Sequence, residues 1–472
     1  MDERVQAAED VDPGGDEGLG GGIAQPRAEP QGPRGRPKKH RPSPPELNRD
    51  LAVVLRHFFP ELSDWLGQVE DPRRSGKAVF PMKVLLLLGA LMFLGHSGSR
   101  NHFNDRARDA REMARTLSRL LGCAVDVLPH LDTLETVLRR TTPAAAEIIL
   151  AKMIRRLIRM KALDDWRIGG RFPLAVDGTG LHSFRHRHCE NCIEAHHPSG
   201  AVTYSHNLLV AFLAGGDGYA LPIACELVEN PGLVYDKQYC EIKAFHRLER
   251  KIRELYPQTR FHLLLDGLYA DQRVMRQALE NDWTFAITFK ESDMPALWRE
   301  AQSLLALAPG QARTVFRPVG GTLQTRWVND LDYQGMALAA IFQVETDKDG
   351  HVAHSFAHLC ADPIDPLNAG PVAAAARMRW RCENEGFNVL KNGGFALEHV
   401  YSRNRAASQA YVGFMLIAHL VQQLLTRGLL ATEFKSAFKT FLNYGIQMLE
   451  ALLSRPLPQN LDPPGQIRLS TA

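Results

Sequence analysis

Two aspartates in this chain stand where a metal-binding catalytic site would need them. Asp177 follows the apolar segment 172–176 (FPLAV), and Asp266 follows the apolar segment 261–265 (FHLLL). A glycine comes directly after each aspartate and leaves the space beside the carboxylate open. Carboxylates on a rigid scaffold are the hard oxygen ligands that Mg²⁺ or Mn²⁺ prefers. We therefore expect Asp177 and Asp266 to hold divalent metal ions.

A third carboxylate is expected on the helix predicted over 373–392. This segment contains both Glu383 and Glu385. Two residues apart on an α-helix, they point about 200° away from each other, so only one can face the aspartates. By itself an aspartate at a strand end is more often a turn or helix-capping residue. It is the combination of three acidic positions in this order that favours catalysis.

The chemistry that such a set supports is cleavage of a phosphodiester. In-line attack needs an activated water or 3′-hydroxyl and a stabilised leaving oxygen, and two metal ions roughly 4 Å apart supply both. The sequence shows no phosphate-binding P-loop that would indicate ATP-driven chemistry.

The elements around these residues alternate in a recognisable order. Period-2 and apolar patterns predict three strands, then a helix, a strand, a helix and a strand. Their predicted ranges are 172–176, 206–213, 219–228, 236–256, 261–265, 272–280 and 284–289. This is the order of an α/β, RNase H-like mixed sheet flanked by helices, in which an antiparallel meander precedes parallel strands.

The chain, with 472 residues of which 45% are hydrophobic, is long enough for several domains. We expect an N-terminal helical domain, a catalytic core interrupted by a β-rich insertion, and a C-terminal helix with an irregular tail. The predicted boundaries are 1–47 for a disordered tail, 48–168 for a helical, DNA-binding domain, 169–311 and 362–430 for the core, 312–361 for the insertion, and 431–472 for the C-terminal part.

These features together resemble the DDE transposases of bacterial insertion sequences. The resemblance rests on strand–Asp-Gly, a second strand–Asp-Gly, a β-rich insertion, and Arg379-Trp380-x-x-Glu383 on a helix. It covers residues 171 to about 425. In particular, the chain resembles the branch whose catalytic helix reads Tyr-x2-Arg-x3-Glu-x6-Lys, and alignment on Arg379 places the motif glutamate at Glu383.

The match to that helix motif is incomplete. Ala376 occupies the tyrosine position and Leu390 the lysine position, with Lys391 one residue later. These departures affect the assignment to the branch and any specific role for Lys391.

The resemblance implies that Asp177, Asp266 and Glu383 are the catalytic, metal-binding residues of an endonuclease and strand transferase. It also implies that three basic residues contact phosphates beside the scissile bond, namely Arg379, Arg381 and Lys391. The partners would be double-stranded DNA, at the ends of a mobile element and in the target, and a second copy of the chain, since joining paired ends needs at least a dimer. Two alternatives stay open: a catalytically silent or domesticated DNA-binding protein, and a nuclease on the same fold that cuts without joining.

A basic arm near the N-terminus points to DNA as well. Residues 33–42 read PRGRPKKHRP, with Arg34, Arg36, Lys38 and Lys39 around a Gly-Arg-Pro core. This arm resembles the AT-hook, which lies in the narrow minor groove of A·T-rich DNA, where arginines are attracted. The alternative is a solvated basic tail that binds nucleic acid without selectivity.

A segment rich in cysteine and histidine lies between the first two predicted core strands. Cys189-x2-Cys192 is followed by His196 and His197, at spacings that suit tetrahedral Zn²⁺. The alternative is a hairpin whose histidines meet DNA phosphates. Seven cysteines, an odd number scattered along the chain, argue against a disulfide framework and for a reducing compartment.

The location expected from the sequence is the bacterial cytoplasm, in association with the nucleoid. The first 30 residues lack the apolar stretch of a signal peptide. The apolar run at 84–94 is far short of the roughly 20 residues that span a bilayer.

Overall fold

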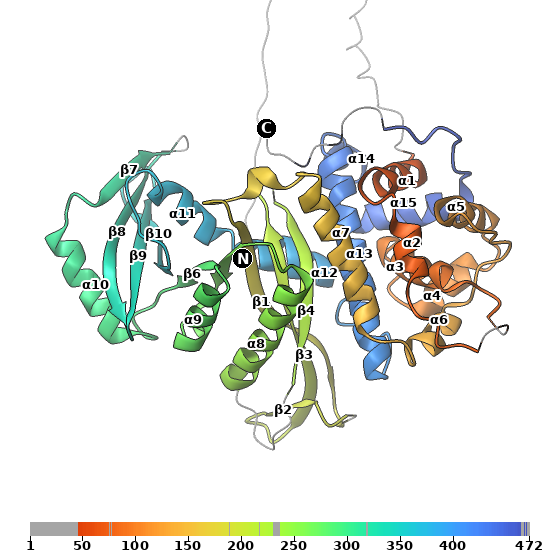
Figure 1. Cartoon of the computed structure of the whole chain (residues 1–472), viewed down its shortest axis with the longest axis horizontal. Helices are drawn as coiled ribbons and strands as arrows, with labels where there is room; N and C mark the ends of the chain where they lie inside the picture. The colour runs from red at the N-terminus through yellow and green to blue at the C-terminus, as the bar shows by residue number, and fades with distance from the viewer. Residues whose placement is uncertain are drawn as a thin grey trace, which may run out of the picture. The chain divides into compact units, whose positions relative to one another are not determined.

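A mixed β-sheet forms the centre of the computed structural model, which describes residues 46–463, 467 and 469 except for positions 75, 77, 188, 217, 230–236, 318 and 319. Its ten strands run in the order β2-β3-β1-β5-β6-β10-β9-β8-β7, and β4 pairs with the remaining part of β3. The described residues are thus of the mixed α/β class, with a large sheet flanked by helices (Figure 1).

The first half of the sheet combines antiparallel and parallel pairing. β1 pairs antiparallel with β3, and β3 pairs antiparallel with both β2 and β4. β5 then adds parallel to β1, and β6 parallel to β5. The bounds of these strands are Phe172–Phe184 for β1, Ile193–His196 for β2, Val202–Ala214 for β3, Ala220–Val228 for β4, Phe261–Leu265 for β5 and Thr284–Thr288 for β6.

The β-rich insertion continues this sheet. β10 pairs antiparallel with β6, with Leu359 opposite Ile287, so the four strands of the insertion extend the same hydrogen-bonded surface. They are β7 (Ala312–Phe316), β8 (Thr322–Tyr333), β9 (Met336–Thr346) and β10 (Val352–Cys360). Helix α10 (Pro295–Leu307) packs on β8, and α11 (Ala369–Arg377) on β6, β8 and β9.

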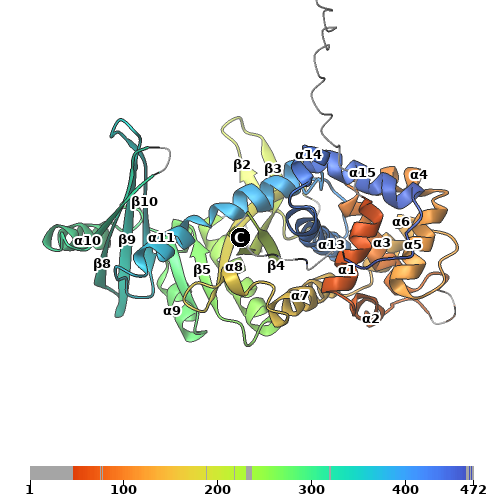
Figure 2. The same cartoon turned by 90° about the horizontal axis from the view of Figure 1, so that it is seen from above.

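Helices form the N-terminal part of the described chain. They are α1 (Leu47–Phe58), α2 (Leu62–Gly67), α3 (Met82–Leu94), α4 (Arg100–Ala107), α5 (Arg111–Leu121), α6 (Leu131–Leu138), α7 (Ala144–Arg159) and the short 3₁₀ helix η1 (Asp164–Trp166). Near the C-terminus, the short α14 (Phe434–Ala437) precedes α15 (Phe441–Ser454), which packs against α1, α3 and α5 (Figure 2).

Helix α13 (Arg405–Gln423) connects the helical layer to the sheet, because it contacts α3 and α7 as well as β4. A π-helical turn, η4 (Leu424–Leu429), continues it. This stretch is the one described helix that is long and apolar enough to cross a membrane, and 83% of its most apolar window is buried inside the structure. Such burial is typical of a core helix.

Two sequence predictions about these elements are wrong. The strand expected to end before Asp177 continues to Phe184, because β3 supplies antiparallel partners beyond the point where β5 ends. The single helix expected over 373–392 is instead divided into α11, a π-helical segment η3 (Cys382–Phe387) and α12 (Asn388–Asn392). Such π-segments are rare and often occur at functional sites.

The remaining helices cover the sheet beside the site described below. α8 (Lys237–Leu255) packs on β4 and β3, and α9 (Gln272–Glu280) packs on β6. The 3₁₀ turn η2 (Gly267–Tyr269) follows β5 directly.

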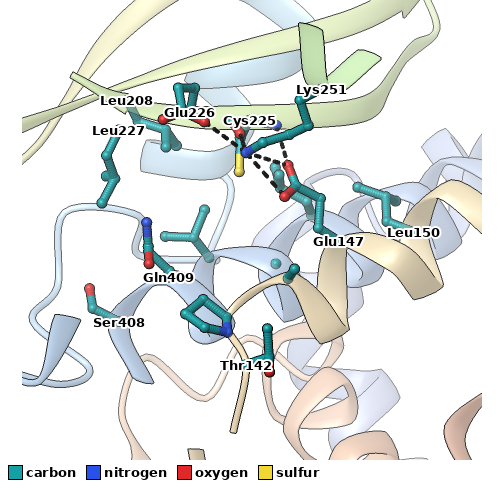
Figure 3. Close-up of a pocket in the computed structure, with 15 residues that line it drawn as sticks. Thr142, Glu147, Leu150, Leu208, Cys225, Glu226, Leu227, Lys251, Ser408 and Gln409 are labelled. Atoms are coloured by element: carbon teal, nitrogen blue, oxygen red, sulfur yellow. Dashed lines mark hydrogen bonds and ion pairs between the residues drawn. The ribbon is translucent and has the colours of Figure 1, made fainter. Parts of the chain in front are cut away.

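One lysine joins three of these elements. The Nζ atom of Lys251 on α8 lies 3.1 Å from Oε2 of Glu147 on α7 and 2.8 Å from Oε2 of Glu226 on β4. It also donates a hydrogen bond of 2.6 Å to the carbonyl oxygen of Cys225. Figure 3 shows this cluster at the wall of a cavity of about 280 Å³. Burial alone would lower the pKa of Lys251, but the neighbouring Cys225 and the two carboxylates, each 15% exposed, raise it.

Replacing Lys251 by methionine should therefore destabilise the fold. Breaking a buried ion pair costs about 3–5 kcal/mol, and because the lysine side chain is 29% exposed, we expect a smaller loss of about 2 kcal/mol. Urea unfolding would measure it. Arg250→Met, an exposed position on the same helix, is the matched control and should change the free energy of unfolding little. Equal midpoints for the two variants would contradict a joining role for Lys251.

Candidate active site

Asp177 and Asp266 lie on neighbouring parallel strands. The last residue pair of the parallel β1–β5 register is Ala175 with Leu264. Each aspartate comes two residues after its member of that pair, so both stand at the same level of the sheet edge. The strand–Asp-Gly pattern therefore brings the two carboxylates to adjacent positions.

The Asp177 carboxylate has partners on both oxygens. Oδ1 accepts a hydrogen bond of 2.8 Å from the backbone N–H of Gly178, and Oδ2 lies 3.1 Å from Nη1 of Arg379. The side chain is 22% exposed, so it is reached from solvent while it is held in one orientation.

Asp266 caps the short 3₁₀ turn η2. Its Oδ1 accepts a hydrogen bond of 2.8 Å from the backbone N–H of Gly267 and lies 3.9 Å from Nζ of Lys290. The side chain is 41% exposed, and that of Lys290 52%. This carboxylate is thus oriented by its own backbone and open to a ligand.

Glu383 stands on the π-helical segment η3 and shares the guanidinium of Arg379 with Asp177. Its Oε1 lies 3.1 Å from Nη2 of Arg379, and its side chain is 40% exposed. The neighbouring Cys382 ties this segment to β1, because its Sγ donates a hydrogen bond of 3.5 Å to the carbonyl oxygen of Ala175. Residues more than 200 positions apart in the chain are thereby joined at one place.

Glu385 is directed elsewhere. Its Oε1 lies 2.9 Å from Nη1 of Arg381, whose Nη2 donates to the carbonyl oxygen of Gly216 at 2.9 Å. The backbone carbonyl of Glu385 is 3.0 Å from Nε2 of the buried His419. Of the two glutamates considered from the sequence, Glu383 is the one that shares a cation with Asp177.

The backbone of η3 is packed closely on the sheet. A Cβ atom at Gly386 would come within 2.8 Å of the ring of Phe212 on β3, so glycine is required here for close approach. The rings of Phe212 and Phe387 pack edge to face, with their centroids 5.5 Å apart. This contact fixes the distance between η3 and β3, the antiparallel neighbour of the strand that carries Asp177.

The electrostatics of the site reflect its crowded acids. Burial raises the pKa of Asp177, and the charges of Glu383 and Asp266 raise it further, while the Gly178 hydrogen bond and Arg379 lower it. Burial, followed by the charges of Glu241, Asp177 and other groups, raises the pKa of Tyr269 well above its usual value.

Three polar residues at the site were not identified from the sequence: Glu241, Lys290 and Asp293. Glu241 on α8 is only 9% exposed, and a Cβ atom at Gly178 would collide with its Oε1. A Cβ atom at Gly267 would come within 2.6 Å of Oδ2 of Asp293. Glu241 belongs to a helix with many charged residues, and the sequence pattern does not show which of its glutamates is buried. Lys290 and Asp293 lie in a loop whose position depends on the sheet.

The basic residues predicted to contact phosphate are engaged within the protein. Arg379 and Arg381 pair with the carboxylates named above, and Nζ of Lys391 lies 2.8 Å from Oε1 of Glu398. Each would have to exchange its partner to bind a phosphate. Arg34, Arg36, Lys38 and Lys39 of the basic arm lie outside the described residues.

The predicted zinc ligands are only partly brought together. Cys189 and Cys192 lie beside each other and beside His206. His196 is instead 3.0 Å from Oε1 of Glu194, and His197 is 2.8 Å from Oγ1 of Thr203. The prediction that His196 and His197 are ligands is therefore wrong. β2 and β3 pair antiparallel, with Ile193 opposite Ser205, and this register places His206 of β3 beside the cysteines.

Among the described residues, the one set of three ligand atoms that all lie within 4.8 Å of one another is that of Cys189, Cys192 and His206, so the three carboxylates at the sheet edge are not gathered as closely. Carboxylate oxygens of Asp177, Asp266 and Glu383 are hard ligands, and they outnumber the positive charges of Arg379 and Lys290 beside them. Burial raises the pKa of Asp177 more than the charges of Glu383 and Asp266 do. A divalent ion beside this carboxylate would favour its charged form.

Comparisons with known proteins give no assignment for this chain. No protein-family model matches it, and no curated protein matches it either. Function is therefore inferred from the arrangement of its own residues.

Asp177→Asn should stabilise the metal-free protein at neutral pH. A raised carboxyl pKa means that the folded state keeps a proton that the unfolded state has lost, so stability falls as pH rises from the usual value near 3.8 through the folded pKa. Removing the buried charge should recover about 1 kcal/mol at pH 7, and nothing below about pH 4.

Chemical unfolding in chelator-containing buffer across this pH range would measure the effect. The control is Asp105→Asn, whose side chain is 74% exposed and should leave the pH profile unchanged. A variant less stable than the parent at pH 7 would mean that the Gly178 hydrogen bond and Arg379 outweigh the cost of burying the Asp177 charge.

Proposed function

We propose that this protein is a transposase, which cleaves and joins DNA strands at the ends of a mobile element with the help of divalent metal ions. The carboxylates of Asp177, Asp266 and Glu383 would form its catalytic centre. The observation that carries the proposal is the bridging position of Arg379, whose two Nη atoms each lie 3.1 Å from a carboxylate, one on β1 and one on η3.

The order of the strands supports an RNase H-like core. Three antiparallel strands, β4, β3 and β1, are followed across the sheet by β5 and β6, which run parallel to β1 and are reached through helices α8 and α9. This agrees with the topology expected from the sequence for a DDE-type enzyme. The long insertion between the second aspartate and the glutamate agrees with it too.

When bound, two divalent ions would activate the attacking oxygen and stabilise the leaving 3′-oxygen. Asp177 and Asp266 would hold them from the sheet, and Glu383 would complete the site from η3. The Gly178 and Gly267 N–H groups orient the two aspartates before any ligand arrives. Arg379 holds Asp177 and Glu383 in position and offsets part of their charge.

Lys290 is suited to contact the DNA backbone at this site. Its side chain is half exposed and stands 3.9 Å from Asp266. An ammonium so placed would attract a phosphate next to the scissile bond. Arg381 and Lys391 are held more closely, at 2.9 Å and 2.8 Å from a glutamate oxygen, and both glutamates lie outside the proposed catalytic set.

The partners that follow from this proposal are double-stranded DNA and further copies of the chain. Joining two ends requires at least a dimer on DNA, and the place of action would be the bacterial nucleoid. A nuclease on the same fold would share the acidic site but release cut ends without joining them.

Asp177→Asn, Asp266→Asn and Glu383→Gln should each reduce cleavage by at least about a hundredfold, because each removes a metal-binding charge. The assay uses duplexes that carry the DNA flanking the coding frame on both sides, with Mg²⁺ or Mn²⁺, and resolves cut and joined products. Binding of the same duplexes, followed by gel shift, should remain unchanged.

Glu385→Gln is the matched control for Glu383→Gln. Both substitutions remove one charge from η3, but Glu385 pairs with Arg381, away from Asp177. We expect its cleavage rate to stay within about tenfold of the parent. Normal cleavage by Glu383→Gln together with an inactive Glu385→Gln would overturn the assignment of the glutamate. Cutting without joined product would favour the nuclease.

A further inference from the structure

We propose that the hairpin formed by β1 and β3 carries a structural Zn²⁺ site made by Cys189, Cys192 and His206, with His182 as the fourth ligand. The site lies outside the carboxylate centre. Its evidence is independent of the proposed function.

The three ligand atoms are spaced as a zinc ion would space them. The two Sγ atoms are 3.6 Å apart, and Nε2 of His206 is 3.4 Å from Sγ of Cys189 and 3.7 Å from Sγ of Cys192. With Zn–S near 2.3 Å and Zn–N near 2.0–2.1 Å, tetrahedral coordination places two sulfurs about 3.8 Å apart and a sulfur and a nitrogen about 3.5 Å apart. One ion would satisfy all three distances at once.

The two cysteines are not a disulfide. A disulfide needs about 2.05 Å between its sulfurs, whereas the Sγ atoms of Cys189 and Cys192 are 3.6 Å apart. The backbone between them forms a tight turn, in which the N–H of Cys192 donates to the carbonyl oxygen of Cys189 at 3.4 Å. A Cys-x2-Cys turn of this kind directs both sulfurs to the same side, as zinc sites require.

The fourth ligand would come from the opposite strand, where His182 would turn its ring toward the group formed by the other three. His182 on β1 is the register partner of His206 on β3, and their ring centroids are 5.7 Å apart. His182, Cys189 and His206 also line the same small cavity. Four protein ligands would close the coordination sphere, which is typical of structural rather than catalytic zinc.

The location of the site explains why a metal would be useful. Beyond Asp177, β1 changes from fully buried to mostly half-buried residues, and β3 shows the same change in its first half. The outer strand β2 has only four residues. Because packing supplies little stability to this part of the hairpin, a metal that joins the turn before β2 to both long strands would hold it in shape.

The zinc site and the carboxylate centre are separate. His182 and Asp177 are five residues apart on the same extended strand, a separation of roughly 16 Å at about 3.3 Å per residue. Zinc at His182 would therefore stabilise the strand that carries Asp177, but it would lie too far from Asp177 to take part in catalysis.

The test is the metal content of the full-length chain, purified without chelators or immobilised-metal columns, by elemental mass spectrometry. We expect about one zinc per chain in the parent. Cys189→Ser, Cys192→Ser and His206→Ala should lower zinc retention after dialysis by more than about tenfold, and His182→Ala should lower it as well. Replacement of zinc by Co²⁺ should give the visible absorption of a tetrahedral site with thiolate ligands.

Matched controls separate this site from general effects. Cys123→Ser, His196→Ala and His197→Ala change the same residue types outside the cluster and should keep the zinc. Glu383→Gln should also keep it, so that failure of the proposed catalysis and failure of the zinc site can be told apart.

Three outcomes would overturn the proposal. They are a parent protein without zinc after growth with added zinc, unchanged zinc in the double variant Cys189→Ser/Cys192→Ser, and an intact mass showing an oxidised Cys189–Cys192 pair. The first and third outcomes are measured on the parent chain alone. They can therefore overturn the proposal even if a variant misfolds. Unchanged zinc in His182→Ala would overturn the assignment of the fourth ligand.

Discussion

The shared guanidinium of Arg379 is the interaction on which the acidic site depends. It lies 3.1 Å from carboxylate oxygens of both Asp177 and Glu383, and its own side chain is only 13% exposed. Without a cation between them, acids held this close by β1 and η3 would repel each other, and burial already raises the pKa of Asp177. Arg379 thus allows the sheet and the π-helical segment to pack together while their acidic groups remain ready for a metal ion.

The secondary structure could be predicted where it follows from local pattern. The predicted ranges 261–265 and 272–280 agree with β5 and α9 residue for residue. The outer half of β1 could not be predicted in this way. Residues 178–184 contain two glycines and polar groups, and they form a strand only because β3 lies beside them. The π-helical turn was missed for a similar reason, since the close approach of Gly386 to Phe212 is a long-range contact.

The same distinction applies to the functional residues. Asp177 and Asp266 can be selected from the sequence, because an apolar strand followed by Asp-Gly is a local signal with a physical meaning. Glu241 cannot, since its burial against Gly178 depends on how α8 packs on the sheet. The zinc ligands illustrate the point once more. Sequence proximity to the cysteines favours His196 and His197, whereas the strand register brings up His206.

The two proposed metal sites make different demands on the same strand. At Asp177 the chain tolerates unfavourable electrostatics, because a site that binds divalent ions needs several acids in one place. Farther along β1, at His182, the strand has little apolar packing. A zinc ion bound by cysteine and histidine side chains would cross-link the strands there and compensate for the missing packing. A rigid outer hairpin would limit the motion of β1, and therefore of Asp177 relative to Arg379. The geometry of the carboxylate centre would in this way depend on ligands that take no part in its chemistry.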